Sequence, residues 1–343
     1  MNDISQIKIS EIARITQSSL ALVSRYFKNF DGEKVQRVNN RIVGITPESA
    51  EEYLKQVEHN YFYKPAIILS ANLCGGVGKT TGIYNLGSCL RRITNRNTPI
   101  VYVDGDPQGS FTSIVYGQPA SYDEPILIDF LEGNAKIDDV LTEINNNVWF
   151  IKSNLNQVWI DKVLSKPQDI KKCMLRFYED IFKKLGNNTK IFQDHTPQLS
   201  SLFASSICAL NQMSDEILKA VIIPIRGDKF AIQGADYILK EILELTETFS
   251  LKNGIDIHCF FSSIDRRLSV TAEALKVARS KENIVNCLSP IAVRYCAEVP
   301  KSIMSSSNVF TSKKNNNAAE DYQDLLQYIF NYKSHGENRD GKP

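Results

Sequence analysis

The residues with the most direct chemical meaning form a glycine-rich segment that ends in a lysine and two threonines. It reads Gly75-Gly76-Val77-Gly78-Lys79-Thr80-Thr81 and follows the apolar run Ala66-Ile67-Ile68-Leu69-Ser70. Glycines let backbone N–H groups turn toward a polyphosphate, the lysine supplies a cation for the β- and γ-phosphates, and Thr80 can bind Mg²⁺ at a helix N-terminus. The sequence therefore predicts a P-loop, in a variant form because Leu73 stands where the general pattern has its first glycine.

Carboxylates follow two other apolar runs. Asp104 and Asp106 come directly after residues 100–103, and Asp194 comes directly after residues 190–193. In open α/β sheets, ligands bind at the carboxyl ends of the strands, where such groups manage a metal and an attacking water. We expect all three aspartates to join the P-loop, although a capped turn would also explain Asp104 and Asp106. His195 is expected to be a loop residue rather than a catalytic base.

The elements that would position these residues alternate between short β-rich runs and helical segments. This alternation predicts the α/β class: a P-loop NTPase fold with a mostly parallel sheet flanked by helices. Residues 161–184 form a charged amphipathic stretch that predicts one or two surface helices. We expect this ATPase domain to span residues 64–333 and the polar residues 334–343 to form a disordered tail. The predicted strands cover residues 66–70, 100–103, 148–151, 190–193, 220–223 and 257–261.

Residues 1–60 have a different pattern. Two short helical segments within 9–27 break at Thr16-Gln17-Ser18, with Ser10 and Ser18 as expected N-caps. A hairpin turning at Asn39-Asn40 and a helix opening at Thr46-Pro47 follow. This order predicts a winged helix-turn-helix DNA-binding domain, while a small helical bundle for dimerisation is the alternative. The expected DNA contacts are Ser18, Ser19, Arg25, Arg37 and Arg41, and, for DNA of any sequence, Arg266 and Arg267.

The composition is that of an ordinary globular protein. Of 343 residues, 43% are hydrophobic and 23% are charged, and the net charge of +1 neither requires nor excludes nucleic acid. The seven cysteines show no CxxC spacing, which favours a reducing cytosol. No apolar run approaches the length needed to span a bilayer, so we expect a cytoplasmic protein without a membrane partner.

Four segments together resemble the ParA/MinD class of deviant-Walker ATPases. They are residues 75–81, Asp104-Gly105-Asp106-Pro107-Gln108, the Asp194-His195-Thr196-Pro197-Gln198-Leu199 segment and residues 223–234. The resemblance runs from about residue 66 to residue 329 and is most specific in the first two segments. A helix-turn-helix ahead of the ATPase is similar to the larger plasmid-partition ParA proteins, which also bind their own operator.

The resemblance implies ATP and Mg²⁺ as cofactors and assigns roles to individual residues. Lys79 and Asp106 would be catalytic, with Asp106 positioning the attacking water. Thr80 would ligate the metal, and Asp104 and Asp194 would hold it through its waters. The nucleotide-binding residues would be Gly75, Gly76, Val77, Gly78, Lys79, Thr80, Thr81, Asp265, Arg294 and Glu298.

The resemblance also implies a working cycle. ATP would clamp two subunits face to face, and the dimer would bind DNA without sequence preference on the nucleoid. A ParB-type centromere-binding partner would stimulate a weak ATPase and release the DNA, so that repeated cycles move plasmids or chromosomes. The N-terminal domain would repress its own operon. Positioning of a protein cargo would use the same motifs.

One position departs from the family pattern. Its signature lysine falls at position 74, which is Cys74 here. A missing cation should slow hydrolysis, so an ATP-switched DNA-binding repressor or scaffold with little hydrolysis is the alternative function. Lys152 and Arg226 are the candidate substitutes, and for each a solvated surface charge is the competing interpretation.

Overall fold

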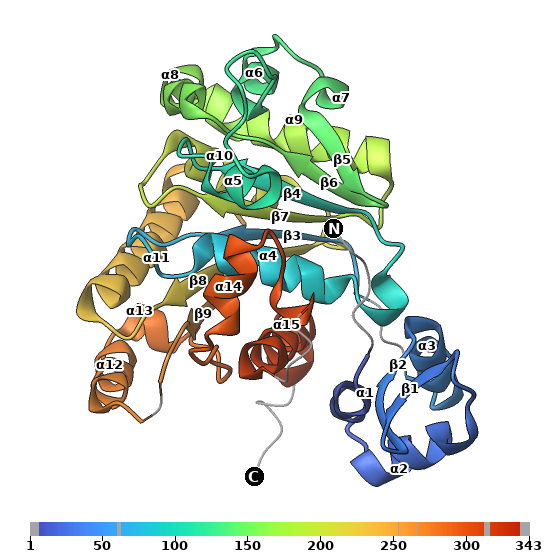
Figure 1. Cartoon of the computed structure of the whole chain (residues 1–343). Coiled ribbons are helices and arrows are strands. Elements are labelled where there is room, and N and C mark those ends of the chain that lie inside the picture. The colour runs from blue at the N-terminus through green and yellow to red at the C-terminus, as the bar shows by residue number, and fades with distance from the viewer. Residues whose placement is uncertain (1–6, 60–62, 253, 266, 312–315, 337–343) are drawn as a thin grey trace.

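A seven-stranded sheet lies at the centre of the protein, as the computed structural model shows for residues 7–59, 63–252, 254–265, 267–311 and 316–336 (Figure 1). The strand order is β5-β6-β4-β7-β3-β8-β9, and all neighbours are parallel except the pair β5 and β6. The six predicted strands are confirmed, and β5 is an antiparallel edge strand that was not predicted. The strands are β3 (Ala66–Ser70), β4 (Ile100–Gly105), β5 (Leu141–Asn145), β6 (Val148–Ile151), β7 (Lys190–His195), β8 (Leu218–Ile225) and β9 (Asp256–Phe261).

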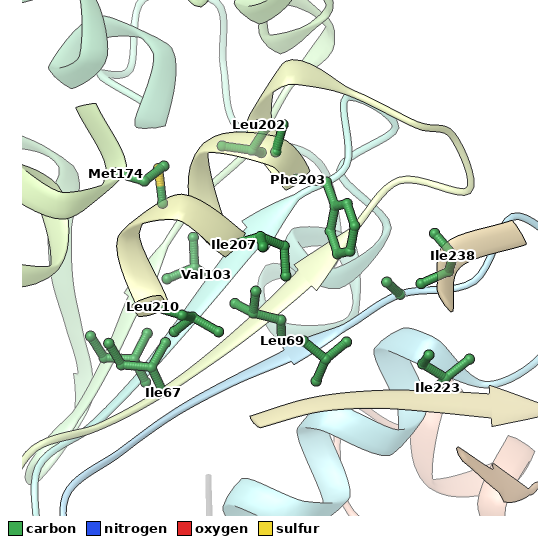
Figure 2. Close-up of a cluster of buried hydrophobic side chains, with 14 of the residues drawn as sticks. Ile67, Leu69, Val103, Met174, Leu202, Phe203, Ile207, Leu210, Ile223 and Ile238 are labelled. Carbon is green, nitrogen blue, oxygen red and sulfur yellow. The ribbon is translucent and has the colours of Figure 1, made fainter. Parts of the chain in front are cut away.

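Helices cover both faces of this sheet because alternate strand residues point to opposite sides. On one face, Ile67 and Leu69 of β3 pack with Phe203 and Ile207 of α10 (Ser201–Gln212), as Figure 2 shows. On the other face, Ala66 and Ile68 pack with residues of α4 (Lys79–Leu90) and α15 (Asn317–Gly336). The remaining helices of this part are α5 (Ser110–Tyr116), α6 (Leu127–Glu132), α7 (Ile137–Val140), α8 (Ile160–Val163), α9 (Pro167–Leu185), α11 (Lys229–Thr248), α12 (Ser269–Arg279), α13 (Glu282–Val285) and α14 (Glu298–Met304).

The structure of the central part differs from two expectations. The charged stretch at 161–184 does form two helices, but α9 buries Met174, Phe177 and Tyr178 against the sheet. Helix α15 continues to Gly336, so the segment from residue 334 begins as helix rather than as a disordered tail. Residues 337–343 lie outside the described residues. Among the residues that the structure describes, no helix combines the length and apolar character needed to cross a membrane.

The N-terminal part forms a separate small unit of helices and a hairpin (Figure 1). It contains α1 (Ile9–Ile15), α2 (Leu20–Tyr26), β1 (Val35–Val38), β2 (Arg41–Ile45) and α3 (Pro47–Gln56). The hairpin turns at Asn39 and Asn40, which both have positive φ, as predicted. The expected N-caps are wrong: α1 follows Lys8 without a side-chain cap, and Ser19, whose hydroxyl accepts from the N–H of Leu22, caps α2.

The N-terminal unit is joined to the central part by ion pairs and a shared apolar cluster. Arg92, just after α4, donates to both carboxylate oxygens of Glu11 at 2.7 and 2.6 Å, and both side chains are only 11% exposed. Arg14 pairs with Glu320 and Asp324 of α15, in a more exposed position. The two parts therefore pack against each other through α1, α4 and α15.

We expect Arg92→Ala to lower the free energy of unfolding by about 3 kcal/mol, since it leaves the Glu11 carboxylate buried without its partner. Arg14→Ala is the matched control, because its carboxylate partners are 42% and 35% exposed. Its expected cost is below about 1 kcal/mol. Urea denaturation of the two variants checks the difference, and equal losses would contradict it.

Candidate nucleotide-binding site

The predicted P-loop lies between β3 and α4, at the carboxyl edge of the sheet. Gly76 and Gly78 have φ values of +67° and +95°, which favour glycine, and Gly78 is the N-cap of α4. Asn72 fixes the start of the loop, since its amide donates to the Pro224 carbonyl at 2.9 Å and its oxygen accepts from the Cys74 N–H at 2.8 Å. The loop is thus held in shape by neighbouring backbone.

Two residues of this scaffold were not predicted from the sequence. Asn72 is fully buried, and Ser262, directly after β9, donates its hydroxyl to the Val77 carbonyl at 2.5 Å. A polar residue directly after a buried strand can indicate the ligand-binding edge of an α/β sheet. Their partners come from segments far away in the chain, so their specific contacts could not be read from spacing.

Lys79 lies folded over the loop. Its ammonium donates to the Cys74 carbonyl at 3.2 Å, and the side chain is 7% exposed. Burial lowers the pKa of this lysine, while Asp194 and Asp106 act in the opposite direction. The cation therefore sits among the predicted carboxylates at the mouth of the loop.

Asp194 ends β7 directly beside the P-loop strand. It stands in register with Ser70 of β3 on one side and with Asp104 of β4 on the other. Its Oδ2 accepts a hydrogen bond from the Thr80 hydroxyl, and its buried Oδ1 has no hydrogen-bond partner among the described residues. A buried carboxylate oxygen without a partner is costly unless a further ligand satisfies it.

Asp104 and Asp106 lie at the end of β4, but their surroundings differ. Both oxygens of Asp104 are engaged: Oδ2 accepts from the N–H and the hydroxyl of Thr112 at 2.8 and 2.7 Å, and Oδ1 accepts from the Asp106 N–H at 3.1 Å. Burial raises the pKa of Asp104 to about 6. Asp106 is less buried, and its Oδ1 accepts from the Gln108 N–H at 3.0 Å. The Asp106 carboxylate thus remains accessible at the edge.

These residues fit a nucleoside triphosphate with Mg²⁺. The unpaired Asp194 oxygen, the adjacent Thr80 hydroxyl and the nearby Asp104 form an all-oxygen set, which suits a hard cation that keeps several waters. The loop glycines leave room for phosphates to approach the N–H groups that open α4. The structure therefore brings Lys79, Thr80, Asp104, Asp106 and Asp194 together.

The raised pKa of Asp194 predicts that the stability of the metal-free protein depends on pH. Burial raises its pKa to about 8, against about 3.9 in an unfolded chain, so between these values the folded state holds the extra proton. Its contribution to the free energy of unfolding therefore falls as pH rises toward 8. Asp194→Asn should remove this loss.

Urea denaturation of both proteins at pH 7 and pH 8.5, without Mg²⁺ or nucleotide, checks this. Lys190, whose pKa burial lowers to about 7, acts in the opposite sense but is present in both proteins, so their difference isolates Asp194. We expect the gain of Asp194→Asn over the wild type to be larger at pH 8.5. A gain that shrinks with pH would contradict the expectation.

The residues predicted near the nucleotide base are only partly assembled. Asp265 lines a cavity of about 410 Å³ together with Arg226, Asp228 and Tyr295. Arg294 instead directs its guanidinium to Asp321 of α15, in contacts of 2.7 to 3.1 Å. Glu298 pairs with Lys301 on α14. Of the three predicted residues, only Asp265 lines this cavity.

His195 is not in a loop, contrary to expectation, but is the buried last residue of β7. It points to the face covered by α10, where its Nε2 lies 3.2 Å from the Gln193 amide and its ring contacts Phe203. Burial lowers its pKa to about 3, with Lys79 as a further cause. The imidazole is therefore neutral and a poor base.

The predicted DNA contacts are mostly on the surface. Ser19, Arg25 and Arg41 are exposed and Ser18 is partly exposed, as is expected for residues that contact DNA. Arg37 differs, because its guanidinium donates to the carbonyls of Phe27, Lys28 and Phe30 and so supports the N-terminal unit itself. Arg267 is exposed and paired with Asp265, and Arg266 lies outside the described residues.

Comparison with known proteins agrees with this geometry. The family profile described as "AAA domain" matches residues 65–257, more than half of the chain. The chromosome partitioning protein ParA of Caulobacter vibrioides is 26% identical over 234 residues, which is 66% of this chain and 81% of that protein.

Two solved structures show the same fold. A plasmid partition protein of Borrelia burgdorferi bound to AMPPNP has a TM-score of 0.58 at 20% identity, covering 79% of this chain and 100% of that one. Cobyrinic acid a,c-diamide synthase from Mycobacterium smegmatis, with ADP and magnesium, has a TM-score of 0.59 at 16% identity, covering 79% and 96%.

The chain is a P-loop protein of the α/β class and belongs to the AAA domain family. Within it, the chain is similar to ParA chromosome partitioning proteins. The resemblance inferred from the motifs is thereby confirmed at the level of the family.

Proposed function

We propose that this protein is an ATP- and Mg²⁺-dependent DNA partition ATPase. The observation that carries the proposal is the meeting of Lys79, Thr80, Asp106 and Asp194 at one edge of the sheet, with one Asp194 oxygen unpaired. The ligands of the two solved structures, a nucleotide analogue in one and ADP with magnesium in the other, support the same cofactors.

Each residue has a definable task in this proposal. The N–H groups of residues 76–81 and the Lys79 ammonium bind the phosphates, and Thr80, Asp194 and Asp104 hold the metal directly or through waters. Bound Mg²⁺ supplies neutralisation of the charge that develops on the phosphates. Asp106 orients the attacking water. Hydrolysis by the isolated protein is expected to be weak.

Exposed apolar side chains around the site support a dimer formed through the same edge. They follow the carboxyl ends of four parallel strands, and Trp159 and Phe230 are 52% and 64% exposed. Exposed apolar side chains that gather on one edge are typical of an interaction surface. We propose a second copy of the chain, bound face to face with ATP, as its occupant. The set is Leu155, Val158, Trp159, Leu199, Phe230 and Leu268.

Two surfaces of the protein are proposed to bind DNA. The N-terminal unit acts as a winged helix-turn-helix that reads an operator with α2, because the residues of α2 other than Val23 are exposed or partly exposed. The ATP dimer binds nucleoid DNA of any sequence through exposed basic side chains such as Arg267 and Lys276. A ParB-type partner stimulates hydrolysis and so ends each DNA-bound period.

Binding to scrambled duplex DNA with ATP, with ADP and without nucleotide, at one fixed moderate salt concentration, tests this function. Tight binding only with ATP is the expected result, and it should weaken steeply as salt rises because several phosphates are contacted. Equal binding in all three states, or none in any, would refute an ATP-gated DNA clamp.

A second candidate function is an ATP-switched repressor or scaffold that hardly hydrolyses ATP. Cys74 favours it, because the thiol beside the P-loop, with its Sγ 3.6 Å from the Gly75 carbonyl, supplies no cation. The rate of phosphate release with saturating DNA separates the two. ATP-dependent DNA binding without measurable turnover would support this second function.

A further inference from the structure

The guanidinium of Arg226 lies beside the glycines of the P-loop. Arg226 directly follows β8, and β8 is the neighbour of β3, from which the P-loop emerges. A Cβ atom placed on Gly76 would be 3.7 Å from Arg226 Nη1. The Cys74 side chain is also close enough for an electrostatic interaction with it. A permanent cation thus stands at the loop that receives the phosphates.

Asp228 fixes how this guanidinium is presented. Its Oδ2 accepts from Arg226 Nε at 2.7 Å, while its Oδ1 caps α11 by accepting from the N–H groups of Phe230 and Ala231, both at 3.0 Å. Because one carboxylate both caps a helix and holds Nε, the orientation of the guanidinium is set by the fold. Neither Nη1 nor Nη2 makes a hydrogen bond to another described residue, so both are available as donors.

The other candidate cation at this edge, Lys152, already has partners. Lys152 Nζ donates to Glu124 at 2.9 Å and lies 4.6 Å from the centre of the Tyr116 ring. Its charge is therefore directed toward the loop after α5 and not toward the P-loop. Arg226 is the one of the two whose position and unpaired donors match a phosphate.

We propose that Arg226 is a phosphate-binding residue of this site, which donates from Nη1 and Nη2 to the triphosphate of bound ATP. The proposal rests on the proposed ATP-binding function and adds a residue to it. The planar guanidinium offers two parallel N–H donors, which match phosphate oxygens better than a single ammonium does. Asp228 is a positioning residue, since it acts only through Arg226 and α11.

Equilibrium titration with a fluorescent ATP analogue and Mg²⁺ tests the proposal without relying on turnover. We expect Arg226→Ala to weaken binding roughly 10-fold or more, and Arg226→Lys to recover part of the loss because it keeps the charge without the fork. Lys152→Ala is the matched control and should bind within about twofold of the wild type. Arg226 is half exposed, and thermal unfolding of the variants verifies that they fold.

The phosphate that Arg226 contacts belongs either to the nucleotide of its own subunit or to the nucleotide of a facing copy. Mixing Arg226→Ala with Lys79→Ala distinguishes them, because only the first retains Lys79 and only the second retains Arg226. Recovery of affinity in the mixture assigns the contact to the partner's nucleotide, and no recovery assigns it to the subunit's own.

Wild-type affinity in Arg226→Ala would overturn this inference while leaving the proposed function intact. Equal losses in Arg226→Ala and Lys152→Ala would overturn it as well, since a general charge effect would then explain both. Absence of ATP binding by the wild-type protein would instead refute the proposed function itself.

Discussion

Replacing Asp106 with asparagine should slow ATP hydrolysis by roughly 10²- to 10⁴-fold while leaving ATP affinity nearly unchanged. The introduced amide oxygen could still accept the hydrogen bond from the Gln108 N–H, so the turn after β4 should keep its shape. What is lost is the negative charge that orients the attacking water. Steady-state phosphate release and a nucleotide titration on the same samples measure the two effects separately.

Loss of the Asp106 carboxylate should also prolong binding to DNA. If hydrolysis ends each DNA-bound period, Asp106→Ala should trap a DNA-bound dimer in the presence of ATP, and its dissociation from duplex DNA should slow accordingly. Asp123→Asn, in an exposed loop, is the matched control for loss of one carboxylate. An unchanged DNA lifetime in Asp106→Ala would argue against a partition cycle.

Loss of Lys79 should have the largest effect on nucleotide binding. A hydrogen bond to a charged group is worth about 1.5–3 kcal/mol, which corresponds to roughly 10- to 150-fold in affinity. Lys79→Met keeps most of the buried stem and removes the ammonium that now contacts the Cys74 carbonyl. The variant should therefore fold normally and bind ATP at least roughly 10-fold more weakly.

Titration with the fluorescent ATP analogue measures this loss, and Lys183→Met, on the exposed side of α9, is the control. The DNA binding of Lys79→Met should no longer respond to ATP. Normal ATP affinity in Lys79→Met would mean that the glycine-rich loop is not a nucleotide site.

The features that the sequence predicted well are those with a local physical cause. The P-loop follows from glycine spacing after an apolar strand, and the hairpin turn follows from Asn39-Asn40, which tolerate positive φ. The buried strands β3 and β8 are almost wholly apolar, so their pattern is strong. Strand β5, by contrast, is only partly buried and reads Leu141-Thr142-Glu143-Ile144-Asn145, a weak signal.

What the sequence could not predict is the partner of a side chain when that partner is distant in the chain. Arg294 looked like a residue for the nucleotide, but Asp321 takes its guanidinium, 27 positions away. Arg37 looked like a DNA contact, yet it donates to three carbonyls of its own unit. A charged residue can be located from sequence, whereas the carboxylate or carbonyl that engages it is set by the tertiary fold.

Helix α4 touches the nucleotide site at its first turn and the N-terminal unit just beyond its last. Thr80 contacts Asp194 at one end, and Arg92 holds Glu11 at the other. A displacement of this helix that altered both contacts would couple the two sites, and such coupling is reciprocal. An operator bound to the N-terminal unit would then alter the affinity for ATP by the same factor by which ATP alters the affinity for that operator.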